Sequence, residues 1–245
     1  MVETAKLKSS HDNQSSYMFR QGFLVGFPIM IGYLPVAVAY GVLAKQAGLS
    51  LFELTTMSVL VFAGASQFMA VNMIAVGTGM LEIVIAVFIL NFRHFVMSLS
   101  FMNRMRPVHL KWKAPLALGL TDETFAVSSL HPEKAAKKQG SLFYVILFLT
   151  AYIAWIGGSF LGGILGEIIP ERLSQSMGIA LYAMFIGLLV PAVKKQWRLA
   201  LIALMAMLIN VICLEGIHMS SGWAIVLGTV IGGASGVFLL KEDDA

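Results

Sequence analysis

The sequence predicts an all-α, polytopic integral membrane protein, and three observations lead to this fold class. Hydrophobic residues make up 58% of the 245-residue chain and charged residues only 12%, whereas a soluble globular domain carries about 25% charged residues. The mean hydropathy is +0.82. Five runs of at least 21 residues contain no Asp, Glu, Lys, Arg or His. Each run is long enough for a helix to cross a hydrocarbon core of about 30 Å.

Polar residues divide the chain into a tail (1–19), one transmembrane domain (20–240) and an acidic tail (241–245). The first apolar run begins near residue 21 and is too long for the core of a cleavable signal peptide. Most Lys and Arg residues lie in short loops, which indicates membrane topology and not nucleic-acid binding. The single Cys213 excludes an internal disulfide and a cysteine-based metal cage. We expect no metal and no cofactor.

The predicted spans fall into two sets. The charge-free runs are 21–44, 54–81, 139–166, 173–193 and 219–240, and a marginal run of 16 residues is 199–214. Two further apolar segments, 83–102 and 114–130, are interrupted by charged residues. We therefore expect about seven transmembrane helices, some of them broken or re-entrant.

The segment 21–44 contains Pro28 and Pro35, each of which removes a backbone donor and clashes with a carbonyl one turn back. Glycines flank both prolines. One interpretation is a broken helix whose freed backbone lines a substrate site, as in many secondary transporters. The other is an ordinary proline kink.

The segment 54–81 brings Ser66, Gln67 and Asn72 into an apolar span. Polar groups at this depth often only hydrogen-bond between helices, and this interpretation suits Ser66 and Asn72. Gln67 follows Gly64 and lies between apolar residues, so we consider it a candidate site residue, with Ser66 beside it.

The segment 83–102 places Arg93 and His94 at the middle of a 20-residue apolar stretch. A charge at the bilayer centre costs at least about 2.5–3.5 kcal/mol on insertion scales, so such a residue normally faces a cavity or a partner. Asn91, His94 and Ser98 would share one helix face. His94 is either a neutral packed imidazole or a proton relay, and Arg93 is either a structural ion pair or a substrate ligand.

The short segment 114–130 carries Asp122 and Glu123 at its middle, and basic loops flank it on both sides. Basic loops favour the cytoplasmic side, so a re-entrant segment with 103–140 on that side is one solution; an interfacial loop with solvated acids is the alternative. In the first case Asp122 or Glu123 is the natural partner of Arg93, because an unpaired charge in low dielectric is costly. Adjacent acids also raise one another's pKa and can hold a proton.

Two features concern the packing and symmetry of the spans. Gly228, Gly232 and Gly236 form a stripe that permits close helix approach, either within the chain or between subunits. If every basic loop is cytoplasmic, the spans of the N-terminal half include one crossing too many or too few. Either 54–81 is therefore re-entrant or the N-terminus is outside. Two re-entrant elements would suit inverted repeats with a site at the membrane midplane.

Four motifs in order resemble a known family. They are the glycine, proline and tyrosine pattern of 26–41, then Phe62-Ala-Gly-Ala-Ser-Gln-Phe68, Asn91-Phe-Arg-His-Phe-Val-Met-Ser98 and Thr121-Asp-Glu-Thr-Phe125. In these the chain resembles the AzlC-type (YgaZ-like) large subunits of the LIV-E branched-chain amino acid exporters. The resemblance covers 20–125 and implies a multi-pass permease of the cytoplasmic membrane. It also implies a small AzlD-like membrane partner and export of valine, leucine, isoleucine or analogues, driven by the proton gradient.

A zwitterionic substrate needs an anion-binding group for its carboxylate and an acceptor for its ammonium. Arg93 or the N-terminus of a broken helix suits the first role. Asp122 or Glu123, with Gln67 and Asn91, suits the second, and His94, Asp122 and Glu123 are the candidates for proton coupling. A channel or another small-solute permease is the alternative. A membrane enzyme is least favoured, because the five histidines are scattered and no zinc-protease or serine-hydrolase motif occurs.

Overall fold

The computed structural model describes residues 2–105, 110–137, 139–170 and 179–239. No β-strand occurs among these residues, and five of their helices are long and apolar enough to cross a membrane. The all-α polytopic class is therefore confirmed. The predicted acidic tail 241–245 lies outside the described residues, as do parts of the basic loop 103–113 and of the run 173–193.

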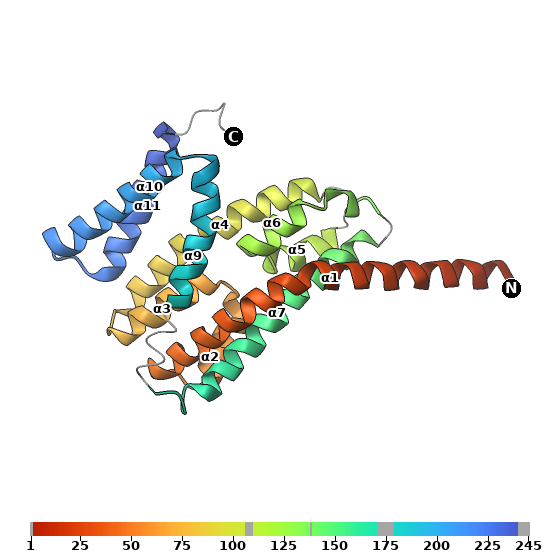
Figure 1. Ribbon diagram of the computed structural model, residues 1–245, viewed down its shortest axis with the longest axis horizontal. Coiled ribbons are helices and arrows are strands. Elements are labelled where there is room, and N and C mark those ends of the chain that lie inside the picture. Colours follow the sequence, from red (N-terminus) through yellow and green to blue (C-terminus); the bar gives the residue numbers. More distant parts are fainter. Residues whose placement is uncertain (1, 106–109, 138, 171–178, 240–245) are drawn as a thin grey trace.

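Figure 1 shows how the described helices are arranged. In chain order they are α1 (Val2–Gln46), α2 (Leu51–Val61), α3 (Gly64–Ala75), α4 (Met80–Arg104), α5 (Leu110–Leu118), α6 (Asp122–Ser129), the 3₁₀ turn Pro132–Lys134, α7 (Gly140–Leu165), α9 (Ile179–Lys195), α10 (Arg198–Val211), the π turn Ile212–Gly216 and α11 (Ser221–Leu239). The π turn extends α10 to a candidate span of 19 residues, Arg198–Gly216, which is longer than the marginal run seen in the sequence.

Helix α1 is continuous through both prolines, so the broken-helix interpretation of 21–44 is wrong. The two prolines are tolerated within this helix because Pro28 and Pro35 lie on its exposed face, while the opposite face packs along α7. The helix ends at Gly48, which has a left-handed φ of 93°. There the Leu49 N–H donates to the Ala44 carbonyl at 3.1 Å, which is a Schellman-type end.

The predicted span 54–81 is instead interrupted between α2 and α3. Helix α2 begins with a capping box, in which the Ser50 hydroxyl accepts from the Glu53 N–H and the Glu53 carboxylate accepts from the Ser50 N–H. It ends at Phe62, a non-glycine residue in the left-handed region at φ 43°. Helix α3 then starts at Gly64. The chain therefore has a helix interruption at Phe62–Ala63 without any proline nearby.

Helices α1 and α7 lie side by side and form the centre of the N-terminal core (Figure 1). Glycines permit this contact: a Cβ added at Gly41 would overlap the Ser159 carbonyl, and one added at Gly162 would overlap the Val38 carbonyl. In lipid, helix association depends on such close packing because no hydrophobic driving force acts between helices. The large buried side chains around this contact include Tyr40, Phe68, Phe101, Phe143, Tyr144 and Leu147.

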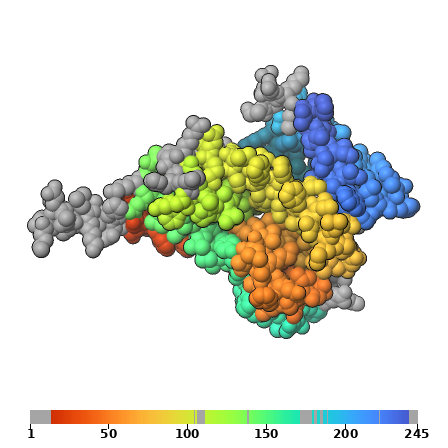
Figure 2. Space-filling model, turned by 180° about the vertical axis from the view of Figure 1, so that it is seen from behind, coloured from red at the N-terminus to blue at the C-terminus, as the bar shows by residue number. Residues whose placement is uncertain are grey.

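The C-terminal hairpin of α10 and α11 packs on itself. Gly228 and Gly232 of α11 face Ala206 of α10, where an added Cβ would lie 2.9 Å and 2.5 Å from its atoms. For these two glycines the stripe is therefore an intramolecular contact. The hairpin is joined to α4 by Glu82, whose carboxylate accepts from the Ser220 hydroxyl and, at 3.1 Å, from the Trp223 N–H. Figure 2 shows α4 between the α2–α3 region and this hairpin.

Candidate functional site

A small cavity lies where five parts of the chain meet. Its walls come from α1, the α2–α3 interruption, α4, the start of α6 and α7; the residues are Tyr33, Phe62, Ala63, Gly64, Ala65, Arg93, His94, Thr121, Asp122, Glu123 and Trp155. The enclosed space is about 20 Å³, which is room for about one water molecule. All four sequence motifs thus contribute to one place: the first contributes Tyr33, the second the uncharged stretch 62–65, and the last two contribute the charged and polar residues.

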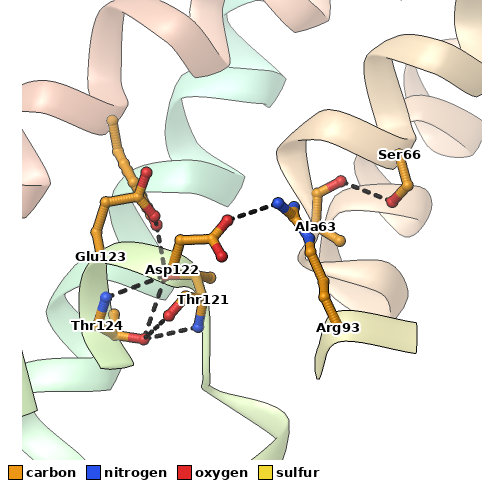
Figure 3. Close-up of polar contacts among 8 residues, drawn as sticks. Ala63, Ser66, Arg93, Thr121, Asp122, Glu123 and Thr124 are labelled. Atoms are coloured by element: carbon orange, nitrogen blue, oxygen red, sulfur yellow. Dashed lines mark hydrogen bonds and ion pairs between the residues drawn. The ribbon is translucent and has the colours of Figure 1, made fainter. Parts of the chain in front are cut away.

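An ion pair crosses the cavity. The Arg93 guanidinium donates to the Asp122 carboxylate at 2.7 Å, and the two side chains are 30% and 31% exposed (Figure 3). The predicted pairing of Arg93 with an acid of the next apolar segment is therefore confirmed, and Asp122 is the acid. A second nitrogen of Arg93, Nε, is buried without a hydrogen-bond partner among the described residues.

Glu123 has a different partner. The Tyr33 hydroxyl donates to the Glu123 carboxylate at 2.5 Å and lies 2.6 Å from the Thr121 hydroxyl. In Figure 3 the Asp122 carboxylate is turned toward Arg93, and the Glu123 carboxylate lies on the side away from Arg93. The two neighbouring acids are thus bonded separately, one to a guanidinium and the other to a phenol.

The start of α6 explains why the two acids sit at this place. Thr121 is the N-cap of the helix: its hydroxyl accepts from the Thr124 N–H, and the Thr124 hydroxyl accepts from the Thr121 N–H. This reciprocal cap ends the loop that follows α5 and starts a new helix. Asp122 and Glu123 then occupy its first turn, where the helix dipole favours negative charge.

The α2–α3 interruption presents backbone to the same cavity. Gly64 and Ala65, in the first turn of α3, line it, and no side chain caps this helix end. A Cβ at Gly64 would lie 2.7 Å from the Trp155 ring, so only glycine permits this contact. The first turn of a helix has unpaired N–H groups and a partial positive charge. The cavity therefore has a cationic side, formed by Arg93 and the start of α3.

Gln67 lies behind this wall and is fully buried. Its amide oxygen accepts from the Trp155 indole N–H at 2.9 Å and from the Ala63 N–H at 3.3 Å. Its amide nitrogen donates to the Ser58 hydroxyl at 2.9 Å. Ser66 is also fully buried and donates to the Ala63 carbonyl at 2.9 Å. Both residues hold the interruption in shape and do not line the cavity.

The remaining predicted residues lie on α4. His94 lines the cavity beside Arg93 and is partly buried. Asn91 is one turn earlier and is not among the lining residues; its side-chain oxygen is buried without a hydrogen-bond partner in the described part of the chain. The described residues contain no group of three or more His, Cys, Asp or Glu that could hold a metal ion.

The structure adds residues that sequence reasoning did not place at the site. Tyr33 belongs to a motif already noted, between Gly32 and Pro35, but an apolar span gives no reason to prefer one tyrosine over another. Trp155 lies in a charge-free run, and no sequence signal marks it. Its position depends on the Gln67 hydrogen bond, which joins residues 88 positions apart.

Comparison with known proteins finds one family and several membrane proteins as relatives. The model of the AzlC protein family matches residues 28–169. An uncharacterized membrane protein of Archaeoglobus fulgidus is 34% identical over 76% of this chain and 81% of that protein. The inner membrane protein YgaZ of Escherichia coli is 28% identical over 77% and 78%. The branched-chain amino acid transport protein AzlC of Bacillus subtilis is 26% identical over 77% and 73%. No solved structure matches.

Proposed function

This chain belongs to the AzlC family and has a membrane transport role, and from this premise we propose that it is a secondary active exporter of branched-chain amino acids. Valine, leucine, isoleucine or close analogues are the substrates, and the proton gradient drives their efflux. The chain works in the cytoplasmic membrane as the large subunit of a permease with a small AzlD-like membrane partner. The substrate class is supported by the Bacillus subtilis relative, a branched-chain amino acid transport protein.

The observation that carries this proposal is the Arg93–Asp122 ion pair. It lies between the interruption at Phe62–Ala63 and a second interruption, residues 119–121, which separates α5 from α6. An amino acid is itself an ion pair, with a carboxylate and an ammonium a short distance apart. Arg93 and the uncapped start of α3 suit the carboxylate, and Asp122 with Glu123 suits the ammonium. Substrate would thus replace a protein–protein ion pair with two protein–substrate pairs.

Opening is part of this mechanism. A space of about 20 Å³ is too small for any amino acid, so the cavity has to widen before substrate enters. Separating Arg93 from Asp122 without substrate leaves two partly buried charges unpaired, which is unfavourable. The ion pair therefore favours the closed form when no substrate is bound, and this opposes leakage across the membrane.

Proton coupling is assigned to the titratable groups that line the cavity: Asp122, Glu123 and His94. Protonation of either carboxylate removes the charge that attracts the ammonium, so substrate affinity falls on the side where the proton binds. Ser66 and Gln67 support the site by shaping its wall, and Asn91 supports it from the adjoining turn of α4.

The partner has apolar surface available. Large side chains on α4 are exposed on the outside of the described chain, including Phe88, Phe92 and Phe95. Lipid covers such faces in a membrane protein, and a small helical subunit can cover part of them. Partner binding is proposed from the family resemblance, and these faces are compatible with it.

The decisive experiment is transport in proteoliposomes containing this chain with and without the small partner. We expect labelled valine and leucine to accumulate against their gradient when a pH gradient is imposed, and a proton ionophore to abolish accumulation. A channel would only equilibrate the substrate. Absence of movement of all three branched-chain amino acids in both preparations would remove the substrate assignment.

Coupling has a separate test. Asp122→Asn and Glu123→Gln, alone and together, are measured in the same vesicles with the gradient on and off. We expect at least one of them to transport valine without a response to the pH gradient. If all three variants keep proton-dependent efflux at the wild-type rate, these carboxylates do not couple transport to protons.

A further inference from the structure

The polar cavity opens beside a much larger apolar groove. This groove lies between α1 and α6 and has a volume of about 460 Å³. Besides Tyr33, Asp122 and Glu123, which it shares with the cavity, it is lined by Pro28, Ile29, Gly32, Val36, Ala126 and Val127. We call it the α1–α6 groove. Its apolar lining and its few charged groups at one end are typical of sites for small molecules, whose volumes are about 300–1,000 Å³.

We propose that the α1–α6 groove receives the aliphatic side chain of the transported amino acid, and that Gly32 determines the largest side chain accepted. This inference rests on the proposed transport function and adds a specificity-determining position to it. The charged end of the substrate is held at Asp122 and Glu123, and the hydrocarbon end extends from there between α1 and α6.

The shared residues distinguish this groove from a second one of similar size. The second groove also measures about 460 Å³ and lies between α2, α5 and α7, but it shares only Phe62 with the polar cavity. No charged residue lines it. An amino acid whose ammonium is bound at the carboxylates can reach the α1–α6 groove directly, whereas the Phe62 ring separates it from the second groove.

Gly32 has the geometry needed to limit side-chain size. An added Cβ at Gly32 would meet no atom within 4 Å. By contrast, Gly26 and Gly41 on the same helix face α7, where a Cβ would meet backbone at 3.1 Å or closer. Gly32 therefore is not required for helix packing. Its missing side chain leaves space inside the groove, one residue before the tyrosine that bonds Glu123.

Substitution at Gly32 removes groove volume without disturbing the fold, because the position is helical and open. One methylene more or less in an apolar pocket changes discrimination by about tenfold to two-hundredfold. The effect must depend on substrate size: leucine and isoleucine lose most, valine less and alanine least. A defect in folding or gating would instead reduce transport of every substrate by the same factor.

The test is a graded series, Gly32→Ala, Gly32→Val and Gly32→Leu, assayed for competition by alanine, valine, leucine and isoleucine. The matched control is Gly157→Ala and Gly157→Leu on α7, where an added Cβ also meets nothing within 4 Å; Gly157 lines neither the polar cavity nor either of the two grooves described above. We expect the leucine-to-alanine preference to fall at least tenfold along the Gly32 series and to stay unchanged in the Gly157 series.

Occupancy of the α1–α6 groove by leucine is measured through the reactivity of a cysteine placed in it. Cys213 is the only cysteine, so Cys213→Ala gives a cysteine-free background for Gly32→Cys and, as the control, Gly157→Cys. Leucine should slow modification of the first cysteine by a membrane-permeant methanethiosulfonate and leave the second unaffected. Lipid occupancy would give no protection by leucine and no size ordering, and either result overturns the proposal for the groove.

The outcomes separate this inference from the proposed function. If the wild-type chain exports leucine and all Gly32 variants keep its substrate preference, the groove assignment fails and the exporter stands. If the wild-type chain moves no branched-chain amino acid, and leucine also fails to protect the Gly32→Cys thiol, the exporter assignment itself fails.

Discussion

The chain interrupts a helix twice at the same cavity, and the two interruptions are built differently. At Phe62–Ala63 the supporting side chains are Ser58, Gln67, Trp155 and Ser159, all uncharged, buried and hydrogen-bonded to one another. Before Asp122 the support is a threonine cap, and the acids beyond it are partly exposed. The first interruption presents fixed backbone donors, and the second presents charges that can change partners.

This difference separates the tasks of the site. A satisfied buried network is rigid, because breaking any bond leaves a desolvated polar group. Two partly exposed carboxylates with single partners exchange them at lower cost. We therefore expect substitutions at the first interruption to act mainly on stability and substitutions at the second to act mainly on transport. Four predictions test this division, from the largest effect to the smallest.

Exchanging the ion pair should have the largest effect. Asp122→Arg or Arg93→Asp alone places like charges together, and each should abolish transport and lower the melting temperature in detergent. The double exchange restores an opposite pair and should recover the melting temperature. Efflux should stay at least tenfold below wild type, because a charged hydrogen bond to substrate contributes about 1.5–3 kcal/mol and both ends now face the wrong group.

The efflux rate and melting temperature of the double variant show whether the ion pair binds substrate or only stabilises the fold. Recovery of both quantities to wild-type values would mean that the pair is purely structural. That result would contradict the assignment of Arg93 and Asp122 to substrate.

Gln67→Leu should be the most destabilising change at the first interruption. It leaves the Trp155 and Ala63 N–H groups without their acceptor, at a cost of about 1–3 kcal/mol for each buried donor. The melting temperature should fall clearly, while the apparent affinity for valine changes by less than about threefold, a free-energy change near 0.65 kcal/mol.

Asn72→Leu is the control for that change, since Asn72 lies on the same helix with its side chain exposed. Asn72→Leu should alter neither the melting temperature nor the apparent affinity for valine. A large loss of valine affinity in Gln67→Leu at an unchanged melting temperature would place Gln67 in direct contact with substrate and reverse the division proposed above.

Tyr33→Phe should have an intermediate effect. It removes the hydrogen bond to Glu123, worth about 1.5–3 kcal/mol for a charged acceptor before solvent exposure is considered, and keeps the ring that packs edge-on against Trp155 at 5.5 Å. We expect a severalfold change in efflux and an altered response to the pH gradient. Tyr40→Phe loses a hydroxyl that bonds the Leu54 carbonyl and interacts with Gln67 and Ser58 outside the cavity. It should leave transport unchanged, and equal effects of the two variants on transport would remove Tyr33 from the site.

Glu82→Gln should have the smallest effect, because this carboxylate lies outside both interruptions. It accepts hydrogen bonds at the start of α11, and glutamine can still accept them. Only the interaction of the charge with the helix end is lost, about 0.3–1 kcal/mol. Thermal unfolding should shift by a few degrees at most, and the efflux rate of folded protein should not change. A loss of transport here would show that the C-terminal hairpin takes part in the cycle.

The fold class and the ion pair could be predicted because both follow from local costs. The apolar composition of the chain predicts that it lies in a membrane. Arg93 within an apolar span requires an acidic side chain as its partner. The helix cap at Thr121 also depends only on neighbouring residues, the stretch Thr-Asp-Glu-Thr. The possible inverted repeats stay a prediction, although two interruptions at one cavity are the arrangement that such repeats produce.

The position of the first interruption could not be predicted for a physical reason. Pro28 and Pro35 are the visible helix breakers, yet α1 continues through both, with the two prolines on its exposed side. At Phe62–Ala63 no residue type signals a break. The left-handed backbone of Phe62 is compensated by the network around Gln67, which accepts a hydrogen bond from Trp155 on the distant helix α7, and such compensation exists only after the chain has folded.

The glycine contact between α1 and α7 limits how the protein can move. Since atoms of the two helices leave no space for even a methyl group at Gly41 or Gly162, neither helix can slide or tilt against the other without a clash. We therefore expect the two helices to stay together during the transport cycle and to hold Tyr33 and Trp155 in place. On this hypothesis Arg93 on α4 and the acids on α6 belong to the moving parts, and alternating access would be a displacement of those two helices past a stationary pair of rings.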